Sequence, residues 1–438
     1  MIAPLLQGFL DEFERLEAAM PGYEQAWLRQ LRRDRLDAFV TSGLPGRREE
    51  AWKYTPLKGL EQRAFALPRG SALPPPLPPP LDAVRHRLVF VDGRFAPESS
   101  RLPADAEIEF LPLSEVFRNH DAAARFRIAR LMGSGEDALD HLNAALATDG
   151  LLLRVPAGRS VREPVHLVYL GSKQSSGRAW HLRGLIELEG GARLRIVEHF
   201  YDGGEEAELS SVINEIQLAA DAELELVRFQ DMGARSILLS RTRLQVEARG
   251  RLRITAIDRG GELVRSEWLT TLRGREAHGD IAGVARLRGR QHADQVVEVR
   301  HLERDTSAEV RFRGVAEDQS RAVFTGTLHV APGASGAETR LSSRNLLLSP
   351  QAEVDTRPVL EIHHDEVVAA HGATVGQLDP EALFYLRSRG FSETMARAIL
   401  IGAFLEEISI RLPEPRFAEW VSSRMGLDHP LPWGGEKT

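Results

Sequence analysis

The sequence predicts a mainly β protein, a right-handed parallel β-helix flanked by N-terminal and C-terminal helical regions. Two registers of apolar residues predict it, because both advance along the chain by just under about 30 residues per step. The first register is Leu188, Leu218, Val246, Leu272, Val299, Leu328 and Val354, and the second is Leu194, Leu224, Leu252, Ile281 and Val310. A solenoid produces this spacing, since each turn of the coil adds one strand to each of two stacked sheets. A β-sandwich is compatible with the alternation alone but does not predict the period.

Short segments inside this region support the same fold. In 191–196, 221–226 and 250–254, a small or turn residue precedes alternating apolar and charged residues. Such alternation places the aliphatic side chains inward and the charged ones in solvent. We therefore expect three regions: a mainly helical one at 1–150, the β-helix core at 151–365, and a C-terminal helical region at 366–438.

The N-terminal region has apolar residues at helical spacing. This spacing predicts helices over 5–20, 23–40, 113–132 and 136–147. Residues 88–95 predict a small hairpin with its turn at Asp92-Gly93. Residues 67–81 form a proline-rich linker, which favours extended polyproline II. In the segment 48–57, we expect Trp52 and Tyr54 to anchor the chain on the core, because aromatic rings bury large areas.

The C-terminal stretch from Val359 to Pro413 carries the clearest functional signal. Residues 359–362 are β-branched and apolar and predict the last strand, while 367–376 is too rich in glycine and small residues for a helix. Asp379-Pro380 predicts a helix over 380–389, since Asp caps the first turn and Pro fits its first position. Ser392 is expected to cap a second helix, over 393–412, which Pro413 ends.

Composition describes an ordinary globular protein. The 438 residues carry 56 basic and 63 acidic side chains, so the formal charge of −7 argues against nucleic acid as the main partner. The first residues lack the basic lead of a secretory signal. No apolar run approaches the roughly 20 residues of a membrane helix. We expect a cytoplasmic protein with no membrane or nucleic-acid partner.

Two motifs resemble one known family. Residues 371–390, HGATVGQLDPEALFYLRSRG, resemble the C-terminal signature of SufD members of the SufB/SufD family, which are scaffold subunits of the SUF iron–sulfur cluster assembly complex. The sequence E-x-W-K-Y-T-P-L at 50–57 resembles the N-terminal motif of the same family. The resemblance implies a β-helix core and a non-catalytic scaffold that pairs with a SufB-like subunit. It also implies that a SufC-like ATPase docks on the C-terminal helices, and this chain has no P-loop motif of its own.

The resemblance assigns a metal-binding role to His371. It implies that this histidine lies at the interface with the SufB-like subunit and offers a neutral ring nitrogen to iron. The chain contains no cysteine, so it holds no cluster stably by itself, and a cluster would be shared with a partner that supplies thiolate and carboxylate ligands. Ala369 occupies a position where some SufD members have Cys. Residue chemistry alone favours a different role for His371, a hydrogen bond that orients a loop, over that of a metal ligand.

The same resemblance predicts a docking surface for the ATPase on the helices at 380–389 and 393–412. Their apolar residues cannot all face one core, so part of this surface is expected to contact a partner. The candidate partner-binding residues are Phe384, Tyr385, Leu386, Arg387 and Arg389. Without a partner, the helix pair would simply cap the end of the β-helix.

Alternatives remain at this point. A β-helix can also be a carbohydrate-active enzyme, which needs clustered acids on one strand face and an aromatic-lined groove, although only 6% of the residues are aromatic. The SufB paralogue is a second alternative, which the absence of cysteine and the HGATVG wording disfavour. The sequence does not determine the cluster type, whether the isolated chain forms a homodimer, or whether the complex binds a flavin. The other histidines are expected to be plain core or surface residues.

Overall fold

The computed structural model describes most of the chain. The described residues are 3–68, 76–77, 81, 84–102, 107–119, 122–133, 135, 137–173, 177–202, 207–409, 412 and 415–426. Most of the predicted proline-rich linker, 69–75 and 78–80, lies outside them. In the part of the chain that is described, no helix is long and apolar enough to cross a membrane.

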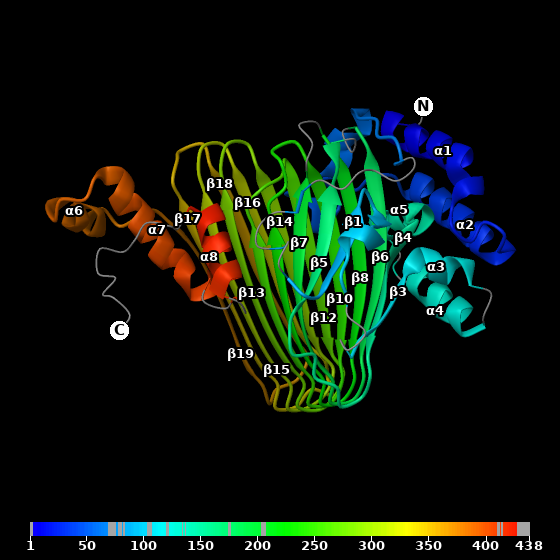
Figure 1. Ribbon diagram of the computed structural model, residues 1–438. Helices are drawn as coiled ribbons and strands as arrows, with labels where there is room; N and C mark the ends of the chain where they lie inside the picture. The colour runs from blue at the N-terminus through cyan, green and yellow to red at the C-terminus, as the bar shows by residue number, and fades with distance from the viewer. Residues whose placement is uncertain are drawn as a thin grey trace.

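The core is a parallel β-solenoid of about 8 turns, as the sequence period predicted (Figure 1). One sheet contains β1 (Arg87–Val91), β2 (Arg94–Phe95), β5 (Val165–Gly171), β7 (Arg193–Asp202), β9 (Glu223–Gln230), β11 (Arg251–Asp258), β13 (His278–Leu287), β15 (Ser307–Ala316), β17 (Glu338–Leu347) and β19 (Val368–Gly376). The other contains β3 (Glu109–Pro112), β4 (Asp149–Val155), β6 (Ala179–Leu188), β8 (Leu209–Leu218), β10 (Ile237–Val246), β12 (Leu263–Leu272), β14 (His292–His301), β16 (Arg321–Val330) and β18 (Glu353–Ile362). From β4 onward, successive strands alternate between the sheets. The predicted hairpin is β1 and β2, and β1 also pairs in parallel with β5.

The two predicted registers face the interior, with two shifts in the first and one in the second. Leu328 pairs with Leu360, which lies six residues after Val354 on β18. Leu272 pairs with His301 rather than with Val299, which lies two residues earlier on β14. Leu252 likewise pairs with Gly279, two residues before Ile281. A shift by an even number of residues keeps a side chain on the same face of its strand, so both registers remain in or against the apolar core between the sheets. The predicted repeat length was therefore correct, whereas the predicted pairing of residues on neighbouring strands was wrong at these positions.

The N-terminal helices pack on the outer face of the nine-stranded sheet, beside its first strands (Figure 1). They are α1 (Pro4–Leu16), α2 (Ala26–Ser42), α3 (Leu113–Arg118), α4 (Ala122–Gly133) and α5 (Ala138–Leu146), with short 3-10 turns at Glu17–Ala19, Glu50–Trp52, Leu57–Gln62 and Pro97–Ser99. Leu139 and Leu142 of α5 join a buried cluster with Leu209 and Leu239 of the sheet. The single helix predicted over 113–132 is wrong, because α3 ends at Arg118 and α4 begins at Ala122.

The segment with the E-x-W-K-Y-T-P-L motif crosses the outer face of the same sheet. The guanidinium carbon of Arg265 on β12 lies 3.7 Å from the ring centroid of the buried Trp52. The hydroxyl of Thr55 lies 3.0 Å from Nε2 of His292 on β14. Glu50 forms an ion pair of 2.7 Å with Arg357 on β18. Trp52 thus anchors the segment as predicted, and the segment reaches the last strand of its sheet.

The C-terminal helices α6 (Pro380–Ser388), α7 (Glu393–Ser409) and α8 (Pro415–Arg424) lie on the opposite side of the solenoid (Figure 1). Ile401 and Leu405 of α7, with Phe417 and Val421 of α8, are buried in one cluster with the outer face of the ten-stranded sheet. The helices predicted over 380–389 and 393–412 correspond to α6 and α7, whereas α8 was not predicted. Helices α7 and α8 cover a sheet face, whereas no residue of α6 is buried, so the idea that the predicted helix pair caps the end of the solenoid is wrong.

A group of polar side chains lies in the core between the two sheets. The guanidinium of Arg228 on β9 donates to Glu198 over 2.8 Å and to the hydroxyls of Ser240 and Thr242 over 2.9 and 3.1 Å. It also lies 4.2 Å from the ring centroid of Trp268. Arg228 and Glu198 are both fully buried. Burial of a charge is costly unless it is paired and hydrogen-bonded, and here both conditions are met.

Candidate functional site

The last turn of the solenoid is open. Among the strands that the structure describes, β19 pairs only with β17 and β18 only with β16, so each is the outermost strand of its sheet. Ile362, Val368 and Val375 at this end are exposed by 41%, 52% and 44%. An open edge with exposed apolar residues is a surface on which another chain can add a strand.

β19 is the last strand, which corrects the sequence-based expectation that residues 359–362 would be. The segment 367–376 was interpreted only as too rich in glycine and small residues for a helix, and no strand was predicted there. It nevertheless pairs with β17 along its whole length, from Glu338 opposite Val368 to Leu346 opposite Gly376. Pairing with a preformed neighbouring strand overrides the weak intrinsic preference of these residues.

His371 continues a column of core residues to the open end. Each residue of this column is the direct partner of the next on adjacent strands. The column runs through Val165, Ile196, Leu226, Ile254, Ile281, Val310 and Leu341 to His371. All members before His371 are at most 3% exposed, whereas His371 is exposed. Its position in the column therefore aims the imidazole at the interior space that the last turn leaves open.

The surroundings of His371 leave the ring available for a ligand. The side chain makes no hydrogen bond or ion pair with another described residue, and it lies in a strand rather than in a loop. Ala369 and Ala373 lie on the same strand face, since strand side chains alternate with a period of 2. An imidazole nitrogen is a common ligand for iron and zinc. Among the described residues, no three His, Asp or Glu side chains come together as a metal site.

Three more histidines lie near this end, on the outer surface. Nδ1 of His329 lies 3.2 Å from the carboxylate of Glu361, and its ring centroid lies 5.2 Å from that of His363. His364 instead accepts a hydrogen bond of 3.1 Å from the backbone N–H of Glu366. The adjacent His363 and His364 thus have different partners.

Helix α6 presents most of the predicted docking residues to solvent. The exposed fractions of Phe384 and Tyr385 are 74% and 55%, and no residue of α6 is buried. Arg387 and Arg389 are exposed, while Leu386 is half-buried. The carboxylate of Asp379 accepts from the N–H of Glu381 over 2.9 Å, which confirms the predicted cap. Two adjacent exposed aromatic rings on a capped helix are typical of a protein-binding surface.

Comparison with known proteins identifies the family. The model described as "SUF system FeS cluster assembly, SufBD core domain" matches residues 169–404, which contain His371 and helix α6. The iron–sulfur cluster assembly protein SufD of Escherichia coli is 30% identical over 396 residues, covering 89% of this chain and 90% of that protein. This chain belongs to the SufB/SufD family. SufD of Bacillus subtilis is 28% identical over 319 residues, with 70% of this chain and 71% of that protein covered. A SufBD family protein of Synechocystis is 27% identical over 431 residues, with 93% of both chains covered.

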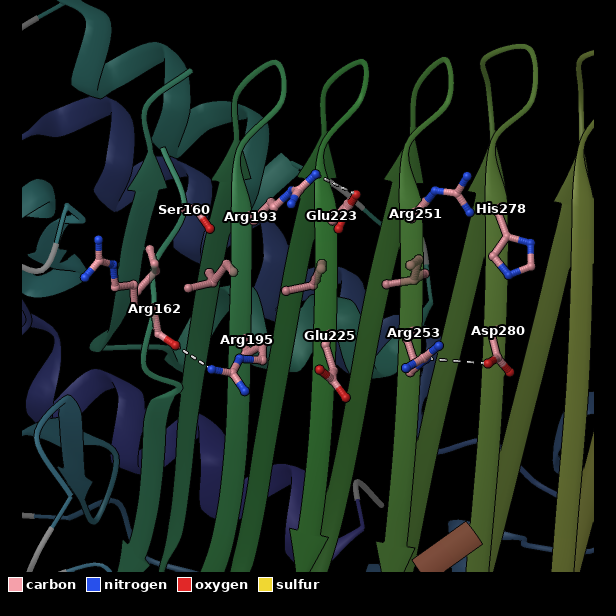
Figure 2. Close-up of a pocket in the computed structure, with 14 residues that line it drawn as sticks. Ser160, Arg162, Arg193, Arg195, Glu223, Glu225, Arg251, Arg253, His278 and Asp280 are labelled. Atoms are coloured by element: carbon pink, nitrogen blue, oxygen red, sulfur yellow. Dashed lines mark hydrogen bonds and ion pairs between the residues drawn. The ribbon is translucent and has the colours of Figure 1, made fainter. Parts of the chain in front are cut away.

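Within this SufB/SufD-family solenoid, a groove crosses the outer face of the ten-stranded sheet. Figure 2 shows two rows of side chains along it, Arg193, Glu223, Arg251 and His278 in one and Arg195, Glu225, Arg253 and Asp280 in the other. The groove has a volume of about 410 Å³. Glu223 lies 3.3 Å from Arg193, and Asp280 lies 3.0 Å from Arg311. None of the described lining residues is Phe, Tyr or Trp, so the groove lacks the aromatic platform that a carbohydrate-active enzyme was expected to have.

The pairing of buried histidines was not visible in the sequence. Nδ1 of His166 lies 2.9 Å from Nε2 of His199, and the ring of Phe417 on α8 packs against both. Trp420 of α8 packs on Tyr201. This cluster attaches α8 to the SufBD core. The residues lie on β5, β7 and α8, so only the strand register, which the sequence did not reveal, brings them together.

The buried histidines predict that acid lowers the stability of the folded protein. Burial lowers the pKa of His301 to about 4, helped by the nearby His329, while the unfolded chain titrates near 6.5. The native state therefore favours the neutral ring, and this stability is complete above pH 6.5 and is lost as the pH falls toward 4. We expect His301→Gln to flatten the pH dependence of the unfolding free energy by about 1.4 kcal/mol per pH unit between these values.

Urea denaturation at pH 7.0, 6.0 and 5.0 measures this slope. His363→Gln, at an exposed position, is the matched control and should leave the slope unchanged. If His301→Gln and the wild type lose stability in parallel, His301 is not buried in its neutral form.

Proposed function

We propose that this chain is a non-catalytic scaffold subunit of a cytoplasmic SUF complex and that it presents His371 to a nascent iron–sulfur cluster. The cluster is the cargo of the complex. The observation that carries the proposal is the core column that ends in an exposed histidine at an open sheet edge. A side chain in that position is held by strand pairing yet is accessible to a second subunit.

A SufB-like subunit is the proposed partner at the open end. Its strands would extend β18 and β19, satisfy their free edges and cover the exposed apolar residues of the last turn. His371 would then offer one neutral ring nitrogen to iron. The partner would supply the thiolates, because this chain has no cysteine, and Ala369 beside His371 adds no ligand.

Helices α6 and α7 are the proposed docking site of a SufC-like ATPase. In support, α7 is packed on the ten-stranded sheet through Ile401 and Leu405, whereas α6 leaves Phe384 and Tyr385 exposed. One helix thus holds the pair on the solenoid while the other remains available. Movement of the ATPase would reach the open end through α6, which follows β19 directly in the chain.

His371→Ala tests the proposal in a complex reconstituted anaerobically from this chain and its SufB-like and SufC-like partners. Subunit assembly should be unchanged, since His371 is not part of the packed core. Bound iron and sulfide should fall by about 10-fold or more, as expected for loss of a metal ligand. His364→Ala, a neighbouring histidine with a backbone hydrogen bond, is the control and should retain wild-type content. Equal cluster content in His371→Ala and wild type would refute the role of this histidine.

A further inference from the structure

A groove of about 920 Å³ lies between the motif segment and the turns that lead into β10, β12 and β14. Tyr54, Thr55 and Pro56 form part of one wall. Residues 288–292, which connect β13 to β14, form part of the other. Its volume lies within the range of small-molecule sites, roughly 300 to 1,000 Å³. None of the roles proposed for the open end or for α6 uses this groove.

The charge of the groove is opposite to that of the chain. Its lining contains five arginines, Arg47, Arg63, Arg288, Arg290 and Arg321, and one carboxylate, Glu262. Five minus one leaves +4 on the lining itself, with His292 neutral because burial and the nearby Arg321 lower its pKa to about 4. Glu317, Glu353 and Asp355 pair with Arg288 and Arg321 from beside the groove, and including these three carboxylates leaves +1. The whole chain has a formal charge of −7. A local excess of positive charge on an acidic chain attracts anions to the groove.

Three of these arginines are held in place by carboxylates. Arg63 donates to both oxygens of Glu262, and Arg321 donates twice to Asp355, at 2.9 and 2.6 Å. Arg288 lies 3.3 Å from Glu317. A guanidinium has five N–H donors, so each of the three retains donors beyond those that its carboxylate uses. These side chains are therefore oriented before any ligand arrives.

The other two arginines have no ion pair with any described residue. Arg47 comes from the loop before the motif, and Arg290 comes from the turn between β13 and β14, so they stand on different walls of the groove. Both are exposed. Guanidinium groups bind phosphate through paired, charge-assisted hydrogen bonds. Tyr54, Leu60 and Leu263 add apolar surface beside the cations.

We propose that this groove binds a small molecule with two or more linked phosphate groups, clamped between Arg47 and Arg290. Arg63 and Arg321 supply further donors, and the apolar wall accommodates a nucleoside where one is attached. The chain has no P-loop motif, so the ligand is bound and not hydrolysed through such a motif. This site is independent of the scaffold role.

Isothermal titration of the full chain with pyrophosphate and with ADP, at constant ionic strength, tests the site. Both ligands should bind saturably, and Arg47→Glu combined with Arg290→Glu should weaken the binding of both by about 10-fold or more. Arg304→Glu is the matched control, because Arg304 is exposed in the turn between β14 and β15 and does not line the groove. The affinity of the Arg304→Glu variant for pyrophosphate and for ADP should change by less than about 2-fold.

The two ligands distinguish the sources of the phosphates. Tighter binding of ADP means that the nucleoside contacts the apolar wall, and equal binding identifies an inorganic oligophosphate site. Absence of saturable binding of either ligand would overturn the proposal. Binding that survives in the double variant, or that sulfate at the same ionic strength displaces equally well, would also overturn it.

Discussion

Replacement of Arg228 by leucine is expected to lower the free energy of unfolding by about 3 to 5 kcal/mol, the usual cost of breaking a buried ion pair. Its guanidinium is the partner of Glu198 and also donates to Ser240 and Thr242. Leucine removes all of these donors and leaves the carboxylate of Glu198 buried between the two sheets without its counter-ion. Urea denaturation followed by circular dichroism measures the loss.

The double variant Glu198→Leu with Arg228→Leu separates the charge effect from packing. Replacing both partners of a buried pair with apolar side chains is often neutral or even stabilising. The double variant should therefore regain most of the stability that the single variant loses. A single variant that costs less than about 1 kcal/mol, or a double variant less stable than the single one, would contradict this account of the polar group in the core.

Removal of the aromatic surface of α6 is expected to abolish capture of the ATPase partner. Exposed aromatic residues at interface centres typically contribute 2 kcal/mol or more each. Phe384→Ser combined with Tyr385→Ser should therefore weaken binding of a SufC-like ATPase by about 100-fold or more. Surface plasmon resonance with the immobilised full chain measures the affinity for the ATPase.

Phe126→Ser provides the matched control for this experiment. Phe126 on α4 is 69% exposed, close to the 74% of Phe384, but it lies on the N-terminal side of the solenoid. Its replacement should leave binding unchanged, and neither change should lower the melting temperature. Undiminished binding to the double variant would place the ATPase elsewhere on the molecule.

The repeat was predictable because a solenoid imposes the same geometry on every turn. Leu188, Leu218 and Val246 are separated by nearly constant steps, and each is the direct partner of the next. The later shift at Leu272 was not predictable, because a displacement by two residues preserves the alternation that the sequence displays. β19 was missed for a related reason: its strand state comes from pairing with β17, and not from its own residues.

The site was predictable only in part. The motif around His371 identified the residue, but its place at the end of a buried column depends on pairings across seven other strands. The cap of α6 could be predicted from Asp379 because capping is local. The arginine groove could not be predicted, because Arg47, Arg63 and Arg290 come from separate segments of the chain. Helix α8 was missed because it is short and its buried face depends on the aromatic cluster of the sheet.

The most direct test of the central claim is whether a nitrogen of His371 binds iron in the assembled cluster. This chain, labelled with ¹⁵N-histidine, is combined with unlabelled partners, and the reduced cluster is studied by pulsed electron paramagnetic resonance. We predict a ¹⁵N hyperfine coupling of a directly bound imidazole, present in the wild type and in His364→Ala and absent in His371→Ala. A cluster that shows no histidine coupling, or one whose coupling persists in His371→Ala, would contradict the account.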